Sequence, residues 1–261
     1  MLALRALFVV VLTLFSVTAL AGSNLRIEYG KPVNDIEAEL KQDLLQSGVV
    51  DSVTHLINDY FDLPETLVFY FGGDDGPMFD GQTNHISTPL EFVAEVKERF
   101  INADYEETGV TPEQATHDAL MHTLFHEFAH AVISIYALPV LGKEEDAADA
   151  LATVLLIEFY DNGQEIALSA ADLFNMESGD RNELGDEDFW DEHSLDEQRY
   201  FTTLCHVYGS DPEKYGYILE EGQLSEDRAD MCIDEYSTVS QSWIELLKPH
   251  IKAEKRKEFE G

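Results

Sequence analysis

Residues 112–137 carry a long helical pattern, and one pentapeptide inside it constrains the fold more than any other feature. Apolar residues recur there at helical spacing, and residues 126–130 read H-E-F-A-H. Positions four apart share one face of a helix, with about 6 Å of rise between them, so both imidazoles face the same way. Two polar rings on an apolar helix are costly to bury without partners. The fold must therefore bring polar groups to this one face.

The H-E-x-x-H spacing suits a metal ion. His126 and His130 can close on one zinc ion at Zn–N distances of about 2.1 Å, and Glu127 can then take a proton from a metal-activated water. The alternative is a pair of surface histidines on an ordinary helix, which the apolar surroundings disfavour. His122 is four residues earlier, but about 12 Å of rise separates it from His130, so both cannot bind one ion with His126. We interpret His122 as a packing residue or as one that supports the ligands.

A third ligand is expected on the next predicted helix, residues 143–160. This helix follows a break that contains Pro and Gly, which lets the chain turn back and lay the helix beside the first. Glu145 and Asp149 share a face of this helix. Glu145 is predicted to complete a His₂Glu site for one zinc ion per chain, and Asp149 to accept the free N–H of a ligand histidine. Glu144 and Asp146 are rivals for the ligand position, but neither has an acid four residues later. The helix dipole also favours acids at this helix start.

The first residues have the three-part layout of a secretory signal peptide. Arg5 precedes an apolar run, and the small-x-small pattern A-L-A stands at residues 19–21. The apolar run is short for about 30 Å of hydrocarbon, so we favour cleavage over an uncleaved membrane anchor. We expect residues 1–21 to be removed and the mature chain to be exported to the periplasm or the cell exterior, without stable membrane insertion.

Export changes the interpretation of Cys205 and Cys232. An even number of cysteines in an oxidising compartment favours a disulfide, and the alternative is two buried thiols. Neither cysteine has a Cys or His at the spacing of a zinc finger, so we do not expect a zinc site from this pair.

The remaining pattern indicates a helix-rich α+β chain. Strands are predicted at residues 67–71 and 85–88. Further helices are predicted at residues 35–61, 90–102, 165–175, 194–207, 225–236 and 238–250. The Asp-rich segment 72–81 is interpreted as a polar turn rather than a calcium loop, because the EF-hand pattern is absent. With no internal repeat or linker, residues 22–261 are expected to form a single domain, with the sheet in about 22–137 and a helical part in about 138–261.

The charge of the chain excludes some partners. It has 52 Asp and Glu against 16 Lys and Arg, a formal net charge of −36. A surface that binds nucleic acid needs clustered Lys and Arg, which are few and scattered here, so nucleic acid is not an expected partner. Docking on an anionic membrane is disfavoured for the same reason. A strongly acidic surface also favours a soluble monomer.

The order of these motifs resembles a known pattern. His126-Glu127-x-x-His130 followed by Glu145-x-x-x-Asp149 is similar to the gluzincin pattern of thermolysin-like zinc peptidases. The wider chain resembles a bacterial family of metallopeptidases of unknown function, over most of its mature length. The runs that carry this resemblance are L-P-V-L-G-K-E-E-D-A-A-D at residues 138–149, D-E-H-S-L-D-E-Q-R at residues 191–199, then Cys205 and Tyr208-Gly209.

The resemblance implies a zincin-like fold, with a small N-terminal sheet over the active-site helix and a mainly helical C-terminal part. It implies a zinc metallopeptidase, a hydrolase that cleaves a peptide or protein substrate with Glu127 as general base. The predicted signal peptide makes this a secreted enzyme. Zincins bind the peptide along an exposed sheet edge, for which residues 77–88 are the candidate.

Thermolysin-like enzymes also stabilise the oxyanion with a downstream His and Tyr. Candidates here are His193, Arg199, Tyr200 and His206, of which we favour His193 as a catalytic residue because it lies in the segment 191–199. The alternative is that His193 only precedes a helix, since the next residues, S-L-D-E, form a capping box.

Two other functions remain open. One is a catalytically inactive zinc-binding or interaction protein that keeps the zincin fold. The intact Glu127 favours the enzyme, because a purely structural zinc site needs no base and closes its fourth position. The other is a zinc hydrolase that acts on a non-peptide amide.

Overall fold

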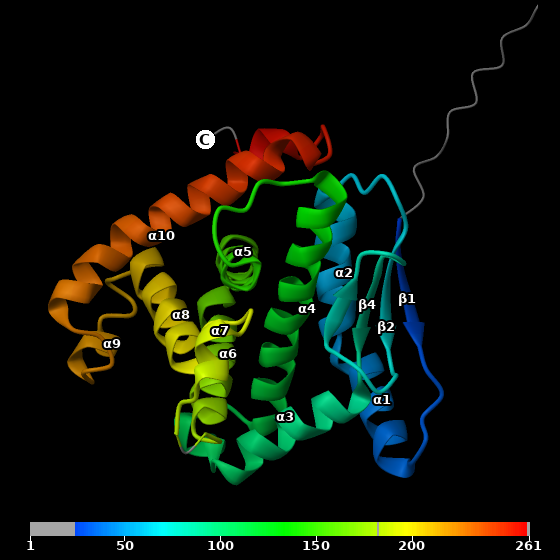
Figure 1. Ribbon diagram of the computed structural model, residues 1–261, viewed down its shortest axis with the longest axis horizontal. Coiled ribbons are helices and arrows are strands. Elements are labelled where there is room, and N and C mark those ends of the chain that lie inside the picture. The colour runs from blue at the N-terminus through cyan, green and yellow to red at the C-terminus, as the bar shows by residue number, and fades with distance from the viewer. Residues whose placement is uncertain (1–23, 182, 260–261) are drawn as a thin grey trace, which may run out of the picture.

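The computed structural model describes residues 24–181 and 183–259, so the predicted signal peptide lies outside the described residues. A four-stranded sheet of order β1-β2-β4-β3 lies at one side of the molecule (Figure 1). Its strands are β1 (Leu25–Tyr29), β2 (Leu67–Phe71), β3 (Met78–Asp80) and β4 (His85–Thr88). β1, β2 and β4 are parallel, and β3 runs antiparallel to β4 at the edge of the sheet. The α+β class is confirmed, as are both predicted strands, whereas the sequence pattern missed β1 and β3.

The helices of the N-terminal part are α1 (Asp35–Ser47), α2 (Val49–Tyr60) and α3 (Leu90–Asn102). The prediction of one helix over residues 35–61 was wrong, because Gly48 separates two helices. Gly48 adopts the left-handed conformation at φ 76°, which glycine reaches without the penalty that a Cβ imposes. The break turns α2 so that its apolar face, including Val53 and Ile57, is buried in the core.

The rest of the chain is helical. Its helices are α4 (Pro112–Tyr136), α5 (Glu144–Phe159), α6 (Gly163–Ser178), α7 (Asp186–Trp190), α8 (Asp196–Ser210), α9 (Tyr217–Glu220) and α10 (Glu226–Leu247), with 3₁₀ turns at Tyr105–Thr108, Lys248–His250 and Arg256–Phe259. The two helices predicted at 225–236 and 238–250 are the single helix α10, because the Ser and Thr residues at their junction weaken a helix without breaking it. Pro249 lies just after α10 ends.

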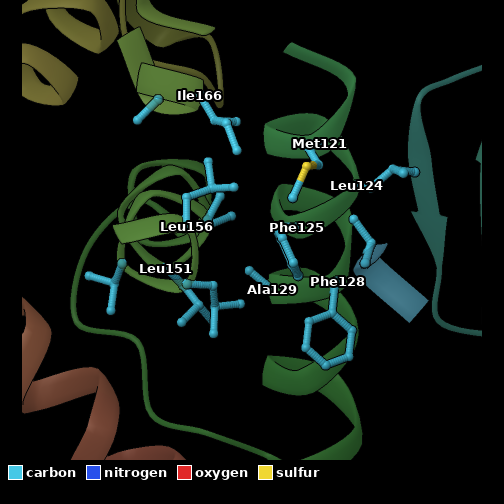
Figure 2. Packing of buried hydrophobic residues seen from close by; sticks show 14 of the residues in the cluster. Met121, Leu124, Phe125, Phe128, Ala129, Leu151, Leu156 and Ile166 are labelled. Carbon is cyan, nitrogen blue, oxygen red and sulfur yellow. The ribbon is translucent and has the colours of Figure 1, made fainter. Parts of the chain in front are cut away.

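Helix α4 runs through the middle of the molecule, between the sheet and the C-terminal helices (Figure 1). The Thr111 side chain accepts a hydrogen bond from the Gln114 backbone N–H and caps its N-terminus. Figure 2 shows Phe125 and Ala129 on the side of α4 that faces Leu151 and Leu156 of α5. Because α4 is buried by sheet and helices alike, its polar residues are held in a fixed frame.

Within the described ranges, each helix is too short or too polar to cross a membrane.

A disulfide joins α8 to α10 across the contact between the two helices, which we call the seam. Cys205 on α8 and Cys232 on α10 form the predicted disulfide, with their Cα atoms 5.1 Å apart. One turn further along α8 the backbones come closer still. A Cβ atom at Gly209 would lie 2.1 Å from the carbonyl oxygen of Cys232. The seam therefore needs a residue without a side chain at this position.

We expect the Gly209→Ala substitution to lower the free energy of unfolding by about 1–3 kcal/mol, because α8 must move away from α10 to admit the methyl group. Urea unfolding followed by circular dichroism measures the effect. Gly142→Ala is the matched control, since a Cβ there meets no atom within 4 Å, and its effect should stay within about 0.5 kcal/mol. Equal stabilities of the two variants would contradict this account of the seam.

Candidate metal centre

The three predicted ligands converge where α4 packs against α5. The Nε2 atoms of His126 and His130 lie 3.2 Å apart, and Glu145 Oε2 lies 3.1 Å from the first and 3.3 Å from the second. Ligands at about 2.1 Å from a common ion, in a tetrahedral arrangement, are separated by about 3.4 Å. The three donor atoms therefore have the spacing that a metal ion needs, and two imidazoles with one carboxylate are a donor set that zinc accepts.

The rival acids of α5 lie elsewhere. Glu144 is half-exposed and its Oε1 lies 2.9 Å from His130 Nδ1, on the far side of the ring from the ligand nitrogen. Asp146 lines a separate cavity together with Asp149. Among the candidate acids, Glu145 is the one that meets both Nε2 atoms.

Asp149 connects His126 to an arginine. Its Oδ1 lies 2.7 Å from His126 Nδ1, and Arg199 of α8 donates two hydrogen bonds to the same carboxylate, at 2.7 and 3.0 Å. The guanidinium lies 3.9 Å from the ring centre of Phe174, so an aromatic face supports it. Burial favours the neutral acid, but the charge of Arg199 and the hydrogen bonds hold the pKa of Asp149 well below its usual range. The ionised carboxylate fixes which nitrogen of His126 is free to bind a metal.

The sequence does not reveal this role of Arg199, because the resemblance makes Arg199 only an oxyanion candidate. Its spacing from Asp149 in the chain is 50 residues, and no local pattern pairs them. The run at residues 191–199 was the available signal, since it ends on this arginine.

The ligand cluster concentrates charge in a protein interior. Burial opposes protonation of His126, but hydrogen bonds to Asp149 and Glu145 outweigh it and raise the pKa of His126 to about 9. Burial likewise opposes ionisation of Glu145, but the hydrogen bonds from His126, His130 and His193 keep its pKa far below the usual range. A metal ion must displace protons from such a cluster to bind.

Glu127 lies beside the cluster and is only 6% exposed. Burial raises the pKa of its carboxyl group, while His126, His130 and a hydrogen bond with the backbone of Phe79 act in the opposite direction. Phe79 belongs to β3, so the sheet edge passes directly by this carboxylate. A buried carboxyl group with a raised pKa is suited to exchange protons near neutral pH.

A groove of about 290 Å³ opens over these residues. One wall is formed by residues 77–79, which lie within the predicted sheet edge 77–88, and the other by Glu192 and His193. The predicted ligands and Glu127 line the same groove. The sheet edge and the ligand cluster thus face a common space.

His193 is the candidate oxyanion residue that reaches this groove. Its Nε2 lies 3.0 Å from Glu145 Oε2, and its side chain is 42% exposed. The Lys143 ammonium holds the loop by donating to the carbonyl oxygens of Asp191 and His193, at 3.0 and 2.8 Å.

The other oxyanion candidates are placed differently. Arg199 is bound to Asp149, and the side chain of Tyr200 is buried. His206 is buried in a cavity on the other side of Arg199, with its Nε2 3.9 Å from Glu235. His122 is also buried, and its Nε2 lies 3.4 Å from Thr153 Oγ1. Burial lowers the pKa of His122 to about 4, so this ring is neutral at physiological pH.

A family model described as "Putative metallopeptidase" matches residues 29–247, which is most of the chain. The chain belongs to this metallopeptidase family. The resemblance inferred from the sequence motifs is thereby confirmed, and the match includes both ligand helices and the loop of His193. Membership implies a metal ion and supports a hydrolase with a peptidase-like role. No curated protein and no solved structure matches the chain.

We expect Asp149→Asn to weaken metal binding by about 10- to 100-fold, because an amide does not hold His126 and Arg199 as the carboxylate does. Competition with a chromophoric chelator measures the affinity, and thermal unfolding of the metal-free proteins checks that the variant folds. Glu144→Gln is the control, since Glu144 contacts His130 from an exposed position, and its effect should be much smaller. Two variants with wild-type affinity would show that these hydrogen bonds do not support the metal.

Proposed function

We propose that the mature chain is an exported zinc-dependent metallopeptidase with a zincin-like fold. The observation that carries this proposal is the convergence of His126, His130 and Glu145 beside the buried carboxyl group of Glu127. The edge strand β3 next to the same helix supports the comparison with zincins. Family membership supports the peptidase-like role.

His126 and His130 would hold one zinc ion through Nε2, and Glu145 through Oε2. Zinc in such a site acts as a Lewis acid, which lowers the pKa of water and polarises a carbonyl group. Glu127 accepts the proton of the attacking water on its carboxylate and later delivers it to the leaving amine. The hydrogen bond with the Phe79 backbone orients Glu127 for this transfer.

His193 faces the reacting carbonyl group from the opposite wall of the groove. Its Nε2 is the atom that would donate a hydrogen bond to the developing oxyanion, which is worth most where water is excluded. The hydrogen bonds from Lys143 to the loop fix its position before substrate arrives. We assign His193 this role over a purely structural one because its side chain points at Glu145 Oε2 in the groove.

The substrate would lie along β3. Because β3 is the edge strand, its outer backbone groups have no strand partner among the described residues, and an extended peptide can add to them. Main-chain hydrogen bonds at that edge would bring a peptide bond over Glu127, which lines the groove beside β3. This fit to an extended chain favours a peptide or protein over a non-peptide amide.

Three further properties belong to the proposal. Residues 22–261 act as a single domain, as a hydrophobic cluster that extends from Leu25 to Leu247 supports. The disulfide supports export to the periplasm or the cell exterior. The net charge of −36 favours a monomer that binds no nucleic acid.

We expect Glu127→Gln to lower kcat/KM for peptide cleavage by about 10²- to 10⁴-fold while the protein keeps about one zinc ion per chain. A peptide library with mass-spectrometric detection measures cleavage, and elemental analysis measures zinc. If the wild-type protein binds zinc but cleaves no peptide, and the variant behaves identically, the inactive zinc-binding alternative is correct instead.

We expect His193→Ala to lower kcat by about 10²- to 10³-fold with little change in zinc content, because the oxyanion loses a donor. His55→Ala, at an exposed position of α2, is the control and should behave as wild type. A variant whose kcat remains normal would return His193 to the role of a residue that only precedes α8.

A further inference from the structure

A further cavity opens beside Glu127 and shares His126 and His193 with the groove. Its volume is about 200 Å³. Residues of α3, α4 and α6 and the start of α8 line it, together with Pro77 and His193. A side chain next to the cleaved bond would enter here, because Glu127 lines both the pocket and the groove.

The pocket has an apolar wall. Phe92 of α3 and Leu173 and Phe174 of α6 line it. Such surfaces take the methylene part of a substrate side chain.

Apart from His126, Glu127 and His193, which the proposed function already uses, three ionisable groups line the pocket, and they differ in what they can still bind. Arg199 is occupied, since its guanidinium donates two hydrogen bonds to Asp149 and lies on Phe174. His122 is neutral because it is buried. Glu177 makes no side-chain hydrogen bond and no ion pair within 4.0 Å among the described residues, although its neighbours on α6 are packed against α8. Apart from Glu127, which the proposed function uses as the base, Glu177 is therefore the carboxyl group of the pocket that has no such partner.

Arg99 lowers the pKa of Glu177 through its charge, but it forms no ion pair with Glu177 within 4.0 Å. Arg99, on α3, forms its ion pair with Asp180 at 2.6 Å. Burial raises the pKa of Glu177, the charge of Asp196 adds to this, and the two arginines act against it. A partly buried carboxyl group without an ion-pair partner among the described residues is the kind whose ionised form a cation from a ligand stabilises.

We propose that this pocket binds a basic side chain, lysine or arginine, of the peptide substrate, with Glu177 as the specificity-determining residue. The methylene stem lies along Phe92, Leu173 and Phe174, and the charged end meets the Glu177 carboxylate. The inference rests on the proposed peptidase function and names the class of substrate that the same site selects.

The test compares the zinc-loaded mature protein on matched peptides. Quenched fluorescent peptides carry Lys, norleucine or Glu at each position that flanks the cleaved bond, and kcat/KM is measured for each. We expect Lys to exceed norleucine by about tenfold or more at one position, and Glu177→Gln to reduce this ratio to near one. Glu177→Lys should favour the Glu peptide. Glu91→Gln, at an exposed position of α3, is the matched control and should keep the wild-type ratio.

The outcomes distinguish a failure of the specificity pocket from a failure of the peptidase function. A wild-type protein that cleaves peptides without a preference for Lys, or a preference that survives Glu177→Gln, overturns the specificity pocket but leaves the peptidase. If the wild-type protein cleaves nothing, the proposed function fails, and binding of labelled Lys and norleucine peptides to the Glu127→Gln protein decides the pocket. Binding selective for Lys that Glu177→Gln abolishes supports it, and equal binding of both peptides overturns it.

Discussion

The rest of the site depends on the hydrogen bonds and charge pairing of the ionised Asp149 carboxylate. This carboxylate joins His126 on α4 to Arg199 on α8, and it belongs to the same helix as Glu145. The consecutive helices α4 and α5 and the more distant helix α8 are therefore held in one register by a single side chain. Buried charges of this kind are stable only when each is paired, so removal of one member leaves the others unsatisfied.

This connection also explains why the site needs a large helical frame. Zinc ligands must be placed within a few tenths of an ångström, and a helix pair alone slides and rotates. The aromatic and small residues between α4 and α5 fix their distance, and the third helix fixes their relative shift through Arg199. The sheet makes a different contribution, because β3 supplies the backbone that orients Glu127. Support of the ligands and support of the base thus come from opposite sides of α4.

Local spacing was enough to predict part of this arrangement. The four-residue spacing of His126 and His130 and that of Glu145 and Asp149 depend on helix geometry alone, so the sequence indicated which side chains share a face. The long apolar helix and the break after it likewise predicted that α5 packs back on α4. The disulfide was predicted on other grounds, from the number of cysteines and the expected compartment.

Other features depend on contacts that no local pattern records. β3 has three residues, too few to show an alternation, and it exists because β4 pairs with it. The break at Gly48 was missed because a glycine inside an apolar pattern is also compatible with a continuous helix. The roles of Arg199 and Glu177 could not be predicted, because they depend on the three-dimensional contacts of these residues. Arg199 binds Asp149, and Glu177 lines a pocket without an ion-pair partner among the described residues.

The disulfide restrains α8, the helix that also carries Arg199. Cys205 lies six residues after Arg199, about 9 Å along the same helix axis. The bond to Cys232 and the contact at Gly209 therefore fix the C-terminal half of α8 against α10. The N-terminal half of the same helix carries the guanidinium of Arg199. A helix that is covalently fixed at one point cannot slide along its own axis. The disulfide at Cys205 therefore also sets the position of the Arg199 charge beside Asp149.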